Sequence, residues 1–125
     1  MANINIFYSW QSDLPGAETR NFIQSCIDAA VKTLKDTVYV EANRDTRGNY
    51  GSPDITNVIF EKIQQCDIFV ADVSIINSEH YELNENGEYV QIQKLSPNPN
   101  VLLELGYAAG VIGWENIICI ANEDY

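Results

Sequence analysis

The sequence predicts an α/β fold in which helices cover both faces of a parallel sheet. Segments with strand-like and helix-like spacing of apolar residues alternate along the chain. Residues 67–73 (DIFVADV) form a nearly continuous apolar run, typical of a strand covered on both faces. The chain has 125 residues, 46% of them hydrophobic, which is enough for one core. We therefore expect one domain over residues 1–125.

Short apolar segments predict the strands, at residues 3–8, 38–40, 67–73 and 116–121. A helical segment separates each strand from the next, so we expect parallel strands joined by right-handed crossovers.

Three segments carry helix signals. Residues 18–35 place their apolar side chains at spacings of three and four, on one helical face. Ser52-Pro53-Asp54 predicts the start of the second helix. Ser is a common N-cap residue, Pro fits the first position of a helix, and the negative charge of Asp is favourable at the positive end of the helix dipole. Asn98-Pro99 opens the third helix by the same logic, and this helix continues to about residue 113.

The connection over residues 74–98 is an insertion, far longer than the ~4–6 residues of a usual connection. Asn86-Gly87 within it predicts a β-hairpin. The insertion is either a tolerated surface loop, or a lid or assembly contact beside a site, since ligands of open α/β sheets bind at the carboxyl ends of strands. Its glutamates are expected to face solvent: Glu79, Glu82, Glu85 and Glu88.

The charge balance excludes some partners. Lys and Arg number 7 against 18 Asp and Glu, for a formal net charge of −11. Duplex nucleic acid and anionic membranes both favour basic surfaces, so neither is expected as a partner. The apolar stretch 101–114 contains Glu104 and is too short for a membrane span of ~20 residues.

The remaining chemistry-bearing residues exclude several kinds of site. Cys26, Cys66 and Cys119 lie in apolar contexts and indicate reduced core thiols in a cytoplasmic protein. The spacing of His, Cys and acidic residues fits no metal site, and His80 stands alone as an ordinary surface histidine. No metal or cofactor is therefore expected. No Walker loop and no G-x-G-x-x-G motif is present.

Polar residues gather at the predicted carboxyl ends of strands, which share one edge of a parallel sheet and can converge on one cleft. Glu104 is the most informative residue near this edge, because it is the only charged residue in the run VLLELGYAAGVIG. A carboxylate on an apolar helical stripe is costly unless a cleft, a partner or a proton stabilises it. Glu104 is either a functional carboxylate in a cleft or a glutamate bonded to backbone near a helix start.

Arg44 and Arg47 lie together in one predicted loop, where they can offset the negative field of the chain for a phosphate ligand. Ion pairs with Asp45 or Glu41 explain the two arginines equally well. Asp72 is either a ligand contact or the cap of the loop that follows it.

Several motifs together resemble a bacterial TIR-like (Toll/interleukin-1 receptor-like) nucleotide-binding domain of antiphage defence systems. They are IFYSWQSD (6–13), Arg20-Asn21, RDTRGNYGSPDI (44–55), IFVADVS (68–74) and NPNVLLELGYA (98–108). The resemblance implies a flavodoxin-like, doubly wound parallel sheet. A full TIR domain continues through a fifth strand and a last helix, and this sequence ends before them. Either the domain is small, or the sequence is a fragment of a larger protein.

The same resemblance implies a function. Many TIR domains cleave the nicotinamide N-glycosidic bond of NAD+, as substrate and not as cofactor, with a catalytic glutamate that falls on Glu104. Ser9 and Trp10 would line the nucleotide pocket. Such domains are defence effectors activated by self-association through TIR–TIR contacts, with a fused or separate sensor domain. The product is either ADP-ribose or cyclic ADP-ribose.

Two alternatives remain open. Asp72, Asn100 and the run from Glu104 to Ala108 (ELGYA) also resemble nucleoside 2-deoxyribosyltransferases, whose glutamate attacks the sugar. Both resemblances imply N-glycosidic chemistry beside a carboxylate. The competing class is a TIR-type assembly module that catalyses nothing, in which Glu104 is structural.

Overall fold

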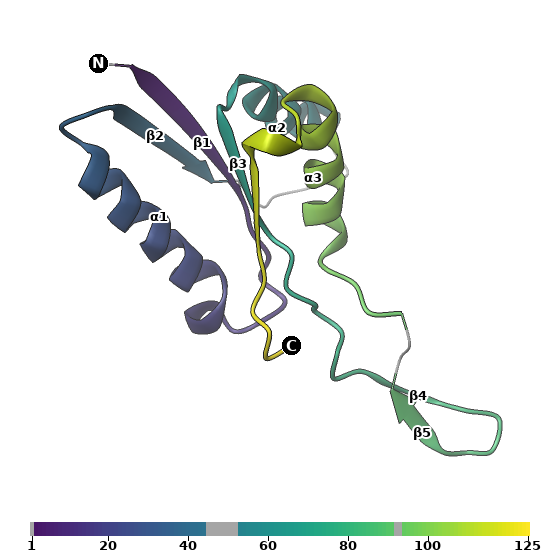
Figure 1. The fold of residues 1–125 in the computed structure, drawn as a ribbon. Helices are drawn as coiled ribbons and strands as arrows, with labels where there is room; N and C mark the ends of the chain where they lie inside the picture. The colour runs from purple at the N-terminus through teal and green to yellow at the C-terminus, as the bar shows by residue number, and fades with distance from the viewer. Residues whose placement is uncertain (1, 45–52, 92–93) are drawn as a thin grey trace.

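Four parallel strands form the central sheet of the computed structural model, which describes residues 2–44, 53–91 and 94–125 (Figure 1). Their spatial order is β2-β1-β3-β6, and every pairing is parallel. The strands are β1 (Asn3–Ser9), β2 (Tyr39–Arg44), β3 (Ile68–Asp72) and β6 (Ile117–Ile120). All four predicted strands are present.

The second strand is longer than the sequence pattern predicts, because it continues past residue 40 to Arg44. Its polar second half carries no apolar signal. Backbone pairing with β1 nevertheless extends from Tyr39, opposite Asn3, to Arg44, opposite Tyr8. Strand pairing overrides the weak local preference of these residues.

Helices cover both faces of the sheet, as predicted for an α/β fold. α1 (Arg20–Leu34) lies on one face, and α2 (Pro53–Gln65) and α3 (Pro99–Val111) lie side by side on the other (Figure 1). The sequence placed the start of the first helix at residue 18, but residues Gly16–Glu18 form a separate 3-10 turn, η1. A second such turn, η2 (Trp114–Asn116), leads into β6.

The strand pleat divides the core into two layers. Phe7 and Phe69 are opposite each other in the β1–β3 register and stack, with ring centroids 5.7 Å apart and planes 8° apart, beneath α2 and α3. The next residue of each strand, Tyr8 and Val70, points to the other face and packs against α1. This alternation decides on which side of the sheet each strand-end residue lies.

The cap of α3 forms as the sequence predicts. Oδ1 of Asn98 accepts hydrogen bonds from the backbone N–H groups of Asn100 (2.8 Å) and Val101 (3.2 Å), which satisfies donors that a helix start leaves open. The helix ends at Val111, before Gly113, whose φ of 84° favours glycine. The predicted cap of α2, Ser52, lies outside the described residues.

The insertion contains the predicted hairpin. β4 (Tyr81–Leu83) and β5 (Tyr89–Gln91) pair antiparallel, and the hairpin extends away from the sheet beyond the carboxyl ends of the strands (Figure 1). Gly87 adopts a φ of 76° in the turn. The four glutamates of residues 79–88 are exposed, as predicted.

The prediction of three core thiols is wrong for two cysteines. Cys66 is buried, and burial together with the nearby Asp67 carboxylate raises the pKa of its thiol to about 11. Cys26 and Cys119 are exposed. Cys119 is opposite Ala71 in the register, but β6 is the edge strand of the sheet and is less covered than the central strands. Across the described ranges, no helix combines the length and apolarity that a membrane span needs.

Candidate active site

The carboxyl ends of the central strands bring most of the predicted site residues to one edge of the sheet. Ser9, Arg44 and Asp72 are the last residues of β1, β2 and β3. Because α3 connects to a parallel strand, it runs back along the sheet and begins at the same edge, with Asn100 in its first turn and Glu104 in its second. The polar residues therefore lie at the carboxyl edge of the sheet, where the sequence predicts them.

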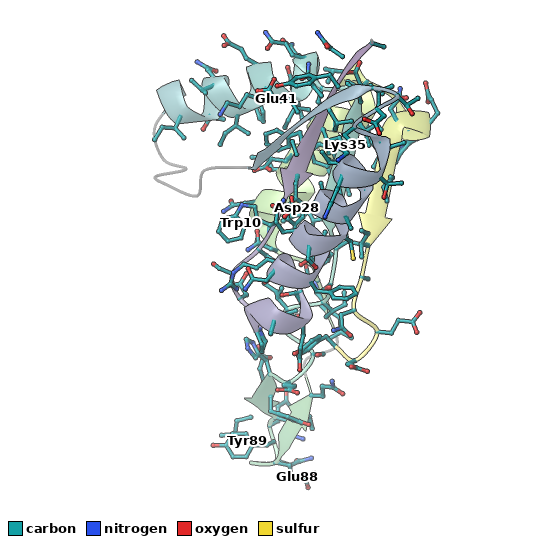
Figure 2. The ribbon with its side chains drawn as sticks, turned by 90° about the vertical axis from the view of Figure 1, so that its left-hand side faces the viewer. Trp10, Asp28, Lys35, Glu41, Glu88 and Tyr89 are labelled. Carbon is teal, nitrogen blue, oxygen red and sulfur yellow. The ribbon has the colours of Figure 1, made fainter. Side chains whose placement is uncertain are left out.

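The pleat separates these residues into two groups. Ser9 follows Phe7 and Tyr8 in alternation, so it faces α2 and α3. Asp72 follows Val70 by two residues and faces α1. Trp10 packs against the α1-side cluster, and Figure 2 shows it on the flank of the molecule away from β6. Ser9 and Glu104 therefore share one face, while Trp10 and Asp72 belong to the other.

Glu104 is fully buried between the sheet and α3. It lies on the helical stripe of Val101, Leu105 and Ala108, which pack against the strand residues of the larger core. A carboxyl group in such surroundings requires hydrogen bonds, a cation or protonation. Residues of small volume, Ser9 and Ala71, are opposite each other where β1 and β3 end on this face.

The hydroxyl group of Ser9 is a buried polar atom without a hydrogen-bond partner among the described residues. The residue is fully buried, and its Oγ makes no hydrogen bond to any part of the chain that the structure describes. Nearly all buried polar atoms in proteins are hydrogen-bonded, so an unsatisfied one needs an explanation. A hydroxyl group both donates and accepts, and Ser9 is therefore suited to contact a ligand on the Glu104 face.

Asp72 is also fully buried, but hydrogen bonds surround it. Its Oδ2 accepts from Nε2 of Gln11 at 2.9 Å, and its Oδ1 accepts from the backbone N–H of Ser74 at 3.0 Å. Oε1 of the buried Gln11 accepts in turn from the backbone N–H of Leu14 at 2.9 Å. The group links the loop after β1 to the end of β3, so Asp72 has the loop-capping arrangement that the sequence left as one alternative.

Gln11 carries no sequence signal that singles it out. It is one of several polar residues after the first strand, and only its burial and its two hydrogen bonds distinguish it from Ser12 and Asp13, which are exposed.

Of the two arginines predicted to bind phosphate, Arg44 and Arg47, the structure describes only the backbone of Arg44. The backbone of Arg44 closes β2 opposite Tyr8, at the carboxyl edge. The side chain of Arg44, and all of Arg47, lie outside the described residues. Asn100 is half-buried at the start of α3. In the described ranges, no group of three or more His, Cys, Asp or Glu side chains is arranged to hold a metal ion.

A cavity of about 370 Å³ opens on the α1 face, between the start of α1, Ser74 and residues 120–124. Its lining includes the acidic side chains of Glu18, Glu123 and Asp124. These charges oppose the binding of a pyrophosphate, and the cavity lies across the sheet from Glu104. A second cavity, of about 380 Å³, lies between residues 13–15, residues 76–80 and Tyr125, and Glu104 lines neither cavity. The buried acid and the Ser9 hydroxyl, and not a cavity, make the Glu104 face a candidate for a nucleotide site.

Fold and site together define a flavodoxin-like α/β domain with a buried acid near its topological switch point. The order β2-β1-β3-β6 places this point between β1 and β3, where ligands of such sheets bind. The family model of the CAP12/Pycsar effector protein TIR domain matches residues 12–125, and the chain belongs to this family. The match confirms the resemblance to bacterial TIR domains of antiphage defence. No curated protein matches the chain.

Proposed function

We propose that this TIR domain cleaves the nicotinamide N-glycosidic bond of NAD+, with Glu104 as its catalytic carboxylate. The observation that carries the proposal is the placement of the fully buried Glu104 on the same sheet face as the unsatisfied hydroxyl of Ser9, at the carboxyl edge of β1 and β3. Buried acids beside a ligand-binding edge are typical of catalytic groups. The TIR family match supports an effector role.

The reaction breaks the bond between C1′ of the ribose and the nicotinamide nitrogen. The bonding electron pair leaves with the ring, which departs as neutral nicotinamide, so no general acid is needed. Positive charge develops on the ribose as an oxocarbenium ion, and the Glu104 carboxylate stabilises it electrostatically or captures C1′ covalently. Water then adds at C1′ and loses a proton to give ADP-ribose. Attack by a nitrogen of the adenine ring gives the cyclic product instead.

The other residues divide between ligand contact and support. Ser9 and Asn100 contact the ribose or nicotinamide, and Arg44 and Arg47 neutralise the pyrophosphate. Asp72 holds the loop after β1 through Gln11. Trp10, packed on the α1 side, belongs to that same loop.

Self-association activates the domain in this proposal, in response to a fused or separate sensor. A catalytically inactive assembly module is the competing function. The exposed insertion hairpin favours it, because that element suits a protein contact better than a lid. A nucleoside 2-deoxyribosyltransferase-like activity is the third candidate, and it uses the same carboxylate.

The test measures NAD+ loss and nicotinamide release by concentrated protein, for the wild type and for Glu104→Gln. The substitution keeps the size of the side chain and removes its charge, so we expect the rate to fall at least about 10²-fold. Glu115→Gln is the matched control, since Glu115 is exposed in η2, and it should retain the wild-type rate. Circular dichroism establishes that each variant is folded.

Three outcomes discriminate the candidates. Release that survives Glu104→Gln removes Glu104 from the mechanism. Absence of release from every protein, even under crowding, favours the assembly module. Release of free base from a 2′-deoxynucleoside, with NAD+ left intact, favours the deoxyribosyltransferase-like activity.

A further inference from the structure

The strands β4 and β5 of the insertion stand apart from the rest of the fold, whereas Glu79 and His80 before them line a cavity with Leu14 and Tyr125. We call residues 79–91 the insertion hairpin, and each of them except Asn84 is exposed. Figure 1 shows β4 and β5 well beyond the carboxyl ends of the sheet, and Figure 2 shows Glu88 and Tyr89 at the far end of the molecule. No helix covers either side of this two-stranded sheet in these views.

One side of the insertion hairpin is apolar. Leu83 is opposite Tyr89 in the antiparallel register, and Tyr81 precedes Leu83 by two residues, so the three side chains share one face. Their exposed fractions are 61% for Tyr81, 61% for Leu83 and 76% for Tyr89. A two-stranded hairpin is marginally stable in water by itself, and a cluster of exposed large apolar side chains indicates a contact surface.

Hydrogen bonds at the base and in the turn hold the insertion hairpin in place. At the base, Nδ2 of Asn77 donates to the carbonyl of Lys94 (3.0 Å), and Oδ1 of Asn77 accepts from the backbone N–H of Ser96 (2.9 Å). In the turn, Oδ1 of Asn84 accepts from the backbone N–H groups of Asn86 and Glu88, each at 2.9 Å. The apolar face is therefore presented in a preorganised form, which lowers the entropic cost of binding.

The net negative charge of the insertion hairpin favours one kind of partner over others. Residues 79–91 contain four glutamates (Glu79, Glu82, Glu85 and Glu88) and no Lys or Arg. A second insertion hairpin brings the same four glutamates, so like charges oppose the pairing of two hairpins with each other. A basic surface is attracted and aligned by the same field.

We propose that the insertion hairpin is a docking surface for a partner protein that presents apolar side chains flanked by Lys or Arg. The apolar face supplies the desolvated centre of the contact, and the four glutamates attract the basic side chains around it through their field. Glu82 is opposite Val90, on the other face of the two strands, so it acts at a distance and not by direct contact with the apolar face. The proposal does not depend on the reaction at Glu104, because both can be measured in one protein and either can fail alone.

The probe is a synthetic peptide in which Lys and Val alternate, titrated into isotope-labelled protein and followed by NMR. We expect amide shifts confined to residues 79–91 and a Kd that rises with salt concentration. A peptide alternating Lys and Ser should bind at least about tenfold more weakly, because it lacks the apolar contact. A peptide alternating Glu and Val should not bind.

Two sets of variants test the apolar and charged parts separately. The apolar variant combines Leu83→Ser with Tyr89→Ser. The charge variant combines Glu82→Gln, Glu85→Gln and Glu88→Gln. Each variant should raise the Kd of the Lys–Val peptide about tenfold. The controls are Leu34→Ser on α1, and Glu115→Gln with Glu123→Gln and Asp124→Asn, which alter exposed apolar and acidic residues elsewhere. They should leave the Kd unchanged. The charge variant keeps the apolar face, so it remains informative if the apolar variant unfolds the hairpin.

Three results would overturn the proposal. Shifts centred outside residues 79–91 place the contact elsewhere. Equal affinity for the Lys–Ser and Lys–Val peptides shows charge attraction without docking. Self-association in sedimentation that disappears with Leu83→Ser and Tyr89→Ser makes a second copy the occupant.

Discussion

Asp72 and Glu104 are both fully buried acids near one edge of the sheet, yet their surroundings differ. Both carboxyl oxygens of Asp72 accept hydrogen bonds, from Gln11 and from the backbone of Ser74. Glu104 lies on an apolar helical stripe, and the Ser9 hydroxyl, which has no partner among the described residues, ends β1 on the same face of the sheet. Hydrogen bonds that connect two loops indicate a structural role for Asp72, whereas the Glu104 face has a polar group left for a ligand.

The link between Gln11 and Asp72 should stabilise the domain. Gln11→Leu keeps the volume of the side chain but leaves a carboxylate oxygen and the Leu14 N–H buried without partners. Because unsatisfied buried groups lose their full hydration energy, we expect the free energy of unfolding to fall by about 1–3 kcal/mol or more. Urea denaturation measures the change.

Gln24→Leu is the matched control for this effect. Gln24 also donates to an aspartate, Asp28, at 3.0 Å, but that pair is exposed on α1. Loss of an exposed pair should cost less than about 0.5 kcal/mol. Equal losses for the two variants would show that burial does not strengthen the Gln11–Asp72 link.

At the scale of elements, α3 serves both the core and the site. Its buried side contributes Val101, Leu105 and Ala108 to the core beneath α2 and α3, and the same side carries Glu104. The position of the carboxyl group therefore depends on how the helix begins. Asn98 fixes that beginning through its cap and also donates from Nδ2 to Oδ2 of Asp13 at 2.6 Å.

Replacement of Asn98 should separate the cap from the link to the first loop. Asn98→Ala removes both, and the lost cap alone costs about 1 kcal/mol of unfolding free energy. Asn98→Ser restores a capping oxygen but not the bond to Asp13, so it should recover most of that loss. If Ser and Ala are equally destabilising in urea denaturation, the cap contributes nothing and the Asp13 bond accounts for the effect.

Element prediction succeeds here where local signals and tertiary pairing agree. Asn98-Pro99 and Asn86-Gly87 specify a helix start and a hairpin turn through their own backbone preferences, and both form. The second half of β2 lacks such signals and becomes a strand only through pairing with β1. Cys26 and Cys119 have apolar neighbours in sequence but are exposed, and Cys119 lies on the edge strand β6, which only the tertiary structure reveals.

At the scale of the whole molecule, the net charge of −11 shapes ligand binding. A negative field favours the oxocarbenium ion of the proposed reaction and disfavours the two phosphates of NAD+. Arg44, whose backbone ends β2 at the carboxyl edge, and Arg47 are the cations that the sequence offers against this field.

Arg44→Ala combined with Arg47→Ala should therefore raise the KM for NAD+ by roughly tenfold, with a smaller effect on kcat. Added salt screens the field and should reduce the difference from the wild type. Lys32→Ala with Lys35→Ala is the control, since both residues are exposed in the last turn and at the end of α1, at the opposite edge of the sheet. An unchanged KM in the arginine variant removes the pair from the phosphate site.

The sequence by itself determined the α/β class, the order of helices and strands, the hairpin and the edge where polar residues gather. The spacing of apolar residues, the helix caps and the turn residues depend on short stretches of sequence, so a single sequence is enough to predict helices, strands and turns from them. Only the tertiary structure decided which residues at that edge face one another. Because side chains alternate along a strand, Ser9 lies on the α3 side of the sheet and Asp72 lies on the α1 side. The structural role of Gln11 depends on its hydrogen bond to Asp72, a residue 61 positions away in the sequence. Contacts of this kind, between residues far apart in the sequence, depend on helix packing and on the register of the strands, and no short stretch of sequence specifies either.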